Sequence, residues 1–166
     1  MNNKEFESIK NKIHMFTQMV ESQGGPGTPL NQERDNPQKR RSGLYGLSVI
    51  AVTLYSKRHT DYMDKILYPV INSFNDKDSK VLLAACDAMY NIVMICKESI
   101  LRQKRFLEIF DHVIGLISSS HDNNVKDHSK KVDDLLKDTV YRSLDRGLMF
   151  DLDQLINAIC ENLIKA

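Results

Sequence analysis

The sequence predicts an all-α protein, a right-handed solenoid of about seven helices stacked in antiparallel pairs. Apolar residues recur at helical spacing through most of the 166 residues, and no segment shows the strict alternation of a half-buried strand. Two stretches also share one layout, in which an apolar helix ends, a polar turn carries an aspartate, and a second apolar helix begins. Their aspartates, Asp78 and Asp122, stand 44 positions apart.

The repeat length indicates the type of solenoid. Two helices in a unit of this length are typical of HEAT and armadillo repeats. Each repeat buries its apolar face only against its neighbours, so the stack offers an extended surface for other proteins. We expect the second helix of each pair to line the concave side of that surface.

The chain is predicted to be a single HEAT-type solenoid fragment, with boundaries taken from the turns and the apolar stripes. Its parts, in chain order, are an N-terminal helix (1–22), a flexible Gly/Pro loop (23–37), the second helix of a first repeat (38–57), one full repeat (61–97), another full repeat (101–142) and the first helix of a following repeat (150–166).

Glycines mark the first two of these helices. The run Gly24-Gly25-Pro26-Gly27 ends the N-terminal helix and opens a polar stretch without periodicity. Gly43 and Gly46 lie inside the apolar stripe of residues 38–57. Each costs about 1 kcal/mol relative to alanine in a helix, so we expect both to pack closely against a neighbouring helix.

The later helices follow the repeat layout. Pro69 lies inside the first helix of residues 61–97 and predicts a kink there. Asp78 and Asp122 stand directly before the second helices and are predicted to cap them. The helix within residues 150–166 has a wide apolar face with no later helix to cover it. We therefore expect this sequence to be the N-terminal part of a longer solenoid.

Composition argues against several classes of function. The net charge of +1 gives no reason to expect a nucleic-acid partner. No apolar run approaches the roughly 18 residues of a membrane span, and the first ten residues are polar and charged, so a cytoplasmic protein is expected. The cysteines stand within apolar helical runs and are predicted to be small core residues in a reducing compartment. They are Cys86, Cys96 and Cys160.

No group of residues predicts catalysis, a metal site or a cofactor. The histidines do not have metal-ligand spacing, and Asp76-Lys77-Asp78 lacks the central glycine and terminal glutamate of a calcium loop. Capping and turn chemistry explain both aspartates. A small helical enzyme would need convergent polar groups in a closed pocket. We therefore predict a protein that is not an enzyme.

Three blocks of the sequence resemble one family, in the same order. They run from Arg40 to Leu47, from Asp76 to Val93 and from Val125 to Val140. They are similar to segments of the vacuole-morphology scaffold, which is the HEAT-repeat protein of the phosphatidylinositol 3-phosphate 5-kinase complex. The resemblance is to the N-terminal region of that scaffold.

The resemblance implies a non-catalytic scaffold, which assembles the lipid kinase and an opposing phosphoinositide phosphatase on endosomal or vacuolar membranes. It would thereby regulate phosphatidylinositol 3,5-bisphosphate synthesis. It also implies a cytoplasmic protein that is peripheral on these membranes through its partners, and self-association through a missing C-terminal region. The alternative is a generic HEAT or armadillo adaptor in trafficking or transport, which would copurify with transport factors instead of a lipid kinase.

One basic cluster is a candidate for partner contact. Lys39, Arg40 and Arg41 are adjacent at the start of a predicted helix. A cluster of this kind binds phosphoinositide headgroups or an acidic protein surface. The other interpretation is a solvated helix start, although basic residues there oppose the helix dipole.

Three further residues are candidates for partner contact. Tyr90 and Asn91 lie just beyond the buried stripe of their helix, where they either line a binding surface or fill a contact between repeats. Lys126 is the basic residue that HEAT motifs often place directly after the valine of the second helix. The preceding repeat has Leu82 at this position, so a ladder of charges along the solenoid is interrupted there.

Overall fold

The computed structural model describes residues 2–22, 35–59, 62–103, 105–145 and 160–161. Within these ranges the chain forms α-helices and short 3-10 helices, without any strand. Most of the predicted Gly/Pro loop and of the predicted last helix lies outside the described residues.

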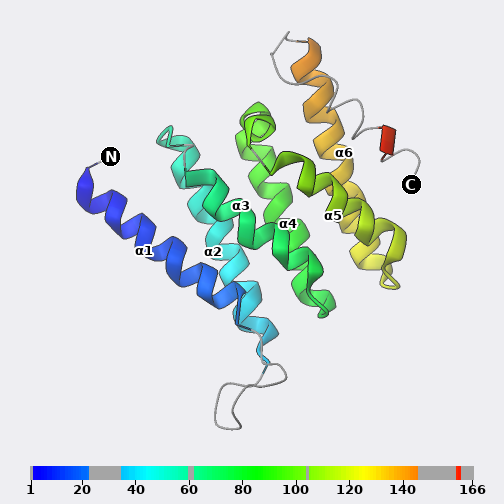
Figure 1. The fold of residues 1–166 in the computed structure, drawn as a ribbon, viewed down its shortest axis with the longest axis horizontal. Helices are drawn as coiled ribbons and strands as arrows, with labels where there is room; N and C mark the ends of the chain where they lie inside the picture. The colour runs from blue at the N-terminus through cyan, green and yellow to red at the C-terminus, as the bar shows by residue number, and fades with distance from the viewer. Residues whose placement is uncertain (1, 23–34, 60–61, 104, 146–159, 162–166) are drawn as a thin grey trace.

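The described helices follow one another along the long axis of the molecule, from α1 at one end to α6 at the other (Figure 1). They form three consecutive pairs, α1 with α2, α3 with α4, and α5 with α6, as the all-α HEAT-type solenoid requires, and that prediction is confirmed. The elements are α1 (Asn3–Val20), α2 (Pro37–Ser56), α3 (Met63–Asn72), the 3-10 helix η2 (Ser73–Asn75), α4 (Ser79–Cys96), the 3-10 helix η3 (Lys97–Arg102), α5 (Phe106–Ser119) and α6 (Asn123–Asp145).

The second helices of the pairs form the tighter layer of the solenoid. α2 packs along α4, and α4 along α6, more extensively than α1 packs on α3 or α3 on α5. Helices that lie on the inner side of a curved stack are closer together than those on the outer side. The packing therefore supports the expectation that α2, α4 and α6 line the concave surface.

The three second helices begin with the same capping device. The side chains of Asn36, Asp78 and Asp122 each accept a hydrogen bond from the backbone N–H of the third helical residue, at 3.0, 3.1 and 3.3 Å. The predicted caps Asp78 and Asp122 are confirmed. Asn36 caps α2 in the same way, so Asn36, Asp78 and Asp122 mark equivalent positions at the start of the second helix in all three pairs.

Both glycines of α2 face α1. A Cβ atom at Gly43 would lie 2.7 Å from the carbonyl oxygen of Phe16 and 2.8 Å from the Cγ2 atom of Val20. At Gly46 it would lie 2.5 Å from the Phe16 ring. The predicted close packing of these glycines is confirmed, and it allows α1 to cover the first repeat.

Two helix boundaries differ from the sequence prediction. α3 ends at Asn72 and continues as η2, where the Ser73 hydroxyl donates to the Pro69 carbonyl oxygen at 2.9 Å. After α4, Lys97 has a φ of 47°, which ends the α-helix, and η3 follows. The helix expected from about Leu101 therefore begins only at Phe106.

α4 corrects the expectation that no segment is long and apolar enough for a membrane span. Its 18 residues have a mean hydropathy of 1.5 and pass that test by length and composition. Lys80 and Asp87 interrupt the apolar run, but the mean hydropathy of the helix remains high enough to pass the test. The core helix of a soluble protein passes the same test. α4 lies between α2 and α6, and Val81, Met89 and Ile92 are buried there.

The cysteines divide into two kinds. Cys86 and Cys96 are buried on α4, and burial raises the pKa of each thiol to about 11. Cys160 is exposed, so its predicted core position is wrong. Apolar neighbours in the sequence do not by themselves bury a side chain, because burial requires a partner packed against it.

We expect Cys160 alone to react rapidly with Ellman's reagent at pH 8. The thiolate is the reacting form, and about one in a thousand molecules carries it at a thiol whose pKa is about 11. The measurement is the number of thiols modified in the fast phase. Cys160→Ser should abolish that phase, and denaturant should expose the two slow thiols. Rapid modification of two or more thiols in the native protein would contradict the buried positions on α4.

Candidate protein-binding surface

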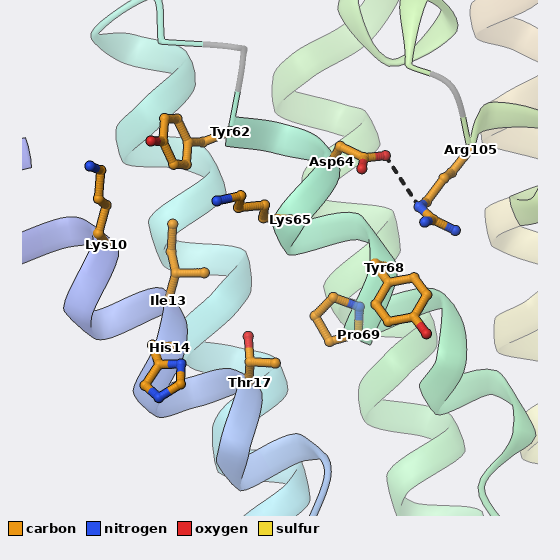
Figure 2. A pocket seen from close by; sticks show the side chains of 10 residues that line it. All are labelled: Lys10, Ile13, His14, Thr17, Tyr62, Asp64, Lys65, Tyr68, Pro69 and Arg105. Atoms are coloured by element: carbon orange, nitrogen blue, oxygen red, sulfur yellow. Dashed lines mark ion pairs between the residues drawn. The ribbon is translucent and has the colours of Figure 1, made fainter.

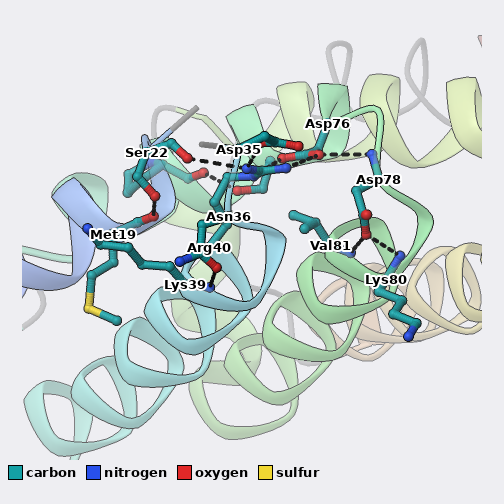
Figure 3. Close-up of polar contacts among 12 residues, drawn as sticks. Met19, Ser22, Asp35, Asn36, Lys39, Arg40, Asp76, Asp78, Lys80 and Val81 are labelled. Atoms are coloured by element: carbon teal, nitrogen blue, oxygen red, sulfur yellow. Dashed lines mark hydrogen bonds and ion pairs between the residues drawn. The ribbon is translucent and has the colours of Figure 1, made fainter. Parts of the chain in front are cut away.

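Arg40, the middle residue of the basic cluster, is buried at the junction of the first two repeats, with 1% of its surface exposed. Its Nε and Nη2 atoms donate to the two carboxylate oxygens of Asp76 at 2.8 and 3.1 Å (Figure 3). Its Nη1 atom donates to Asp35 and to the carbonyl oxygen of Ser22. Burial lowers the pKa of Arg40, but the hydrogen bonds to Asp76 and Asp35 outweigh this effect and hold it above its ordinary value.

Asp76 connects the turn before α4 to the start of α2. Besides pairing with Arg40, its Oδ1 atom accepts the backbone N–H of Asp78 at 2.9 Å (Figure 3). The predicted turn chemistry of Asp76 is therefore confirmed. The bidentate pair with Arg40 was not predicted, because the two residues are 36 positions apart and no local spacing indicates their contact.

The central residue of the basic cluster, Arg40, is therefore not on the surface of the protein. Lys39 and Arg41 are partly exposed, whereas the Arg40 guanidinium has no access to a partner. The prediction that Arg40 contacts a partner is wrong for this reason. Consecutive residues of a helix point in different directions, so three adjacent basic residues do not share one face. For Lys39 and Arg41, partner contact stays a prediction.

The position of Arg40 recurs in the later repeats with different residues. It is the fourth residue of α2, and the fourth residues of α4 and α6 are Leu82 and Lys126. In the turn before α6, Ser120 takes the place of Asp76, and its hydroxyl oxygen accepts the backbone N–H of Asp122 at 3.2 Å. The second junction therefore has an uncharged residue in place of the Asp76 carboxylate. Lys126 is partly exposed at the start of α6, and its contact with a partner stays a prediction.

Exposed large apolar side chains gather on the second helices. Among the described residues, six of the eight such side chains belong to α2, α4 and α6. Tyrosine and methionine on an exposed face are typical of protein interfaces. We call these six residues the second-helix surface. They are Tyr45, Val49, Tyr90, Met94, Ile95 and Tyr141.

Tyr90 lies next to a pocket of about 340 Å³ between α4 and α6. On the walls of this pocket, the imidazole Nε2 atom of His128 lies 3.9 Å from a carboxylate oxygen of Asp87. Tyr90 is 37% exposed and Asn91 is exposed as well. Their exposure supports the binding-surface interpretation over a buried contact between repeats, and the partner contact itself stays a prediction.

The other members of the second-helix surface were not predicted. Tyr45 and Val49 are four residues apart on α2, and Tyr90 and Met94 are four apart on α4, so each pair shares one helix face. That spacing is visible in the sequence outside the predicted core stripes. An apolar pair at this spacing outside the buried positions is the signal that would have found them. Tyr45 and Val49 line a pocket of about 420 Å³ together with Ile9 and Phe16 of α1.

A model of the Vacuolar 14 Fab1-binding region family matches residues 38–138. The matched stretch runs from the first turn of α2 into α6. It includes the Arg40–Asp76 junction and all members of the second-helix surface except Tyr141.

Three curated proteins are similar to this chain over 104 residues, which are 63% of its length. Protein VAC14 homolog of Arabidopsis thaliana is 39% identical, and Protein VAC14 homolog of Schizosaccharomyces pombe is 38% identical. Vacuole morphology and inheritance protein 14 of Saccharomyces cerevisiae is 38% identical. The chain spans only 14%, 12% and 12% of these relatives, respectively.

No solved structure matches this chain significantly. The family match, in contrast, extends over more than half of the chain, from the start of α2 through both junctions between repeats. This chain therefore belongs to the Vacuolar 14 Fab1-binding region family.

Proposed function

We propose that this chain binds a Fab1-type lipid kinase as part of a non-catalytic scaffold. The observation that carries the proposal is the match of residues 38–138 to a region described as Fab1-binding. The matched region supplies α2, α4 and most of α6, which carry the exposed tyrosine and methionine side chains. A rigid stack of repeats that presents such side chains is suited to holding another protein.

In this role the chain acts by placement. A scaffold that holds an enzyme close to its substrate raises the effective concentration of one for the other. The kinase we propose is a phosphatidylinositol 3-phosphate 5-kinase, so the scaffold regulates phosphatidylinositol 3,5-bisphosphate synthesis. The same assembly contains an opposing phosphoinositide phosphatase. The whole assembly acts on endosomal or vacuolar membranes, and this chain is attached to them through its partner proteins.

The proposed contact is the second-helix surface together with a basic edge. Lys39, Arg41 and Lys126 all lie within the first five residues of a second helix, and therefore at the same end of the α2, α4 and α6 layer. Protein interfaces commonly have an apolar centre and a polar rim. We assign the centre to the second-helix surface and the rim to these three basic residues, with Asn91 beside Tyr90.

The double substitution Tyr90→Ala with Met94→Ala should weaken kinase binding by at least about thirtyfold, because even one hot-spot side chain contributes about 2 kcal/mol to an interface. Both side chains are exposed on α4, so the melting temperature should stay close to that of the wild type. The measurement is the dissociation constant of the purified chain for a purified Fab1-type kinase. Met15→Ala is the matched control, since Met15 is 48% exposed on α1.

Two results would contradict this proposal. Equal affinities for the α4 double variant and the Met15→Ala control would exclude the second-helix surface as the contact. Affinity purification from the native cell provides the broader test of the partner. Recovery of transport factors without a lipid kinase would favour the generic HEAT adaptor instead.

A further inference from the structure

The two junctions of the solenoid differ in how closely their helices pack. The first junction joins the pair α1–α2 to the pair α3–α4, and the second junction joins α3–α4 to α5–α6 (Figure 1). α4 packs more extensively along α2 than along α6, and α3 packs more extensively on α1 than on α5. The second junction is therefore the looser one in both layers. In a stack of repeats, the stability of each junction depends on the two repeats that meet there.

A buried ion pair holds the first junction in one geometry. Both members of this pair, the Arg40 guanidinium and the Asp76 carboxylate, are shielded from solvent. A small displacement of α2 from α4 would separate these charges before water could reach them, which is costly. At the equivalent place of the second junction stand Leu82 and Ser120, which cannot form an ion pair.

The buried face of α6 carries half of the buried polar residues that the structure describes. Two of them bond within α6 itself, since the Thr139 hydroxyl donates to the Leu135 carbonyl oxygen and the Ser143 hydroxyl to that of Thr139, both at 2.8 Å. A third, Asp133, pairs with Lys137 of the same helix at 2.7 Å. These contacts stay intact when α6 moves away from α4, so they do not oppose the movement. The four residues are Ser129, Asp133, Thr139 and Ser143.

The described polar contacts between α4 and α6 are long or reach the solvent. The Cys86 Sγ atom is 3.5 Å from the Ser129 Oγ atom, and a thiol is a weak hydrogen-bond partner. The Nε2 atom of His128 is 3.9 Å from a carboxylate oxygen of Asp87, and both side chains are partly exposed. Their pocket of about 340 Å³ lies at the same place. Exposed pairs of this kind contribute little to stability.

The layer of first helices has a similarly weak bridge across the second junction (Figure 2). Arg105 precedes α5, and its Nε atom is 3.2 Å from the Oδ1 atom of Asp64 on α3. These two atoms form no hydrogen bond, and both side chains are partly exposed. The Cζ atom of Arg105 also lies 4.4 Å from the centre of the Tyr68 ring. When the junction opens, Arg105 keeps its contact with Glu108 of α5.

We propose that the pair α5–α6 opens from the rest of the solenoid as one unit, with the second junction as its hinge. Opening moves Tyr141 of α6 away from Tyr90 and Met94 of α4. The second-helix surface thus has a fixed part on α2 and α4 and a movable part on α6, and a partner that contacts both parts holds the junction closed. The contacts at the two junctions carry this inference, so it is independent of the proposed kinase contact.

The test is amide hydrogen exchange of the full chain, followed by mass spectrometry of its peptic fragments. An opened pair of helices loses the packing that stabilises it, so its amides exchange. The slowest amides of α5 and α6 should exchange at one common rate, at least about tenfold faster than the slowest amides of α2 and α4. A uniform rate over all helices would overturn the proposal, since the chain would then open only as a whole. Fast exchange confined to the last turns of α6 would overturn it as well, because it indicates fraying of a helix end.

A reversible crosslink tests where the hinge lies. Ser129 lies opposite Cys86 across α4 and α6, so Ser129→Cys in a Cys160→Ser background brings two thiols within reach of a disulfide. In the oxidised form, exchange in α5 and α6 should slow at least about tenfold, to the rate of α2 and α4. Reduction with dithiothreitol should restore the faster rate, which provides the matched control in the same chain. Equal exchange in α5 and α6 before and after reduction of the disulfide would exclude the second junction as the hinge. If no disulfide forms, the exchange pattern of the wild type alone decides.

Discussion

Arg40→Met should lower the free energy of unfolding by about 3–5 kcal/mol, which is the usual cost of removing one partner of a buried ion pair. The substitution leaves the Asp76 carboxylate buried, with the backbone N–H of Asp78 as its remaining hydrogen-bond donor among those described above. Methionine retains much of the aliphatic volume of arginine, so the loss reports on the charge pair more than on packing. The measurement is equilibrium unfolding in urea, followed by circular dichroism.

The matched control is Arg41→Met, one residue further along α2. Arg41 is only partly buried and forms no ion pair within the described part of the chain, so we expect a change below about 1 kcal/mol. Equal losses in the two variants would mean that the Arg40–Asp76 junction does not stabilise the fold. A binding experiment on the basic cluster should therefore change Lys39 and Arg41 and leave Arg40 intact.

Gly43→Ala should destabilise the protein by about 1–3 kcal/mol, the usual cost of an overpacked contact. Alanine is the better helix former by about 1 kcal/mol, so the expected sign is opposite to that of helix propensity. The new Cβ atom would lie 2.7 Å from the carbonyl oxygen of Phe16, and a backbone atom moves only if α1 moves with it. We therefore expect α1 to shift away from α2. The change in unfolding free energy measures this effect.

Gly115→Ala is the control for this substitution. Gly115 is an exposed residue of α5, and a Cβ atom added there would meet no atom outside its own helix within 4 Å. The substitution should stabilise the protein by up to about 1 kcal/mol. Stabilisation by both substitutions would show that α1 does not pack on α2 at Gly43. Ala85 and Ser129 occupy the equivalent positions of α4 and α6 and are buried. Small side chains are therefore accommodated at this register position in α4 and α6, and Ser129 lies 3.5 Å from Cys86 of α4.

The repeat architecture was predictable because it depends on short-range patterns. Apolar spacing determines which residues share a helix face. Asp78 and Asp122 cap helices that begin at the next residue, so their roles require no knowledge of distant contacts. The cap of the first repeat, Asn36, uses the same chemistry, but its equivalence to Asp78 and Asp122 depends on how the three second helices lie beside each other.

The binding features were less predictable, because they depend on which helix faces meet. The second-helix surface contains Tyr90, which the sequence suggested, and five residues that it did not suggest. A pocket of about 450 Å³ combines Lys10 of α1 with Lys65 of α3 and Arg105 before α5. These residues are far apart in the sequence, and each alone looks like an ordinary solvated charge.

The sequence by itself determined the helical pairs, the caps Asp78 and Asp122 and the length of the repeat, since hydrogen bonds and apolar spacing within a few residues specify them. Only the tertiary structure decided that Arg40 is part of the buried junction with Asp76 and that Gly43 is the contact point for α1. The physical reason is that helical periodicity separates an apolar face from a polar one. It does not specify which distant residue that face will meet, or how much water remains between them.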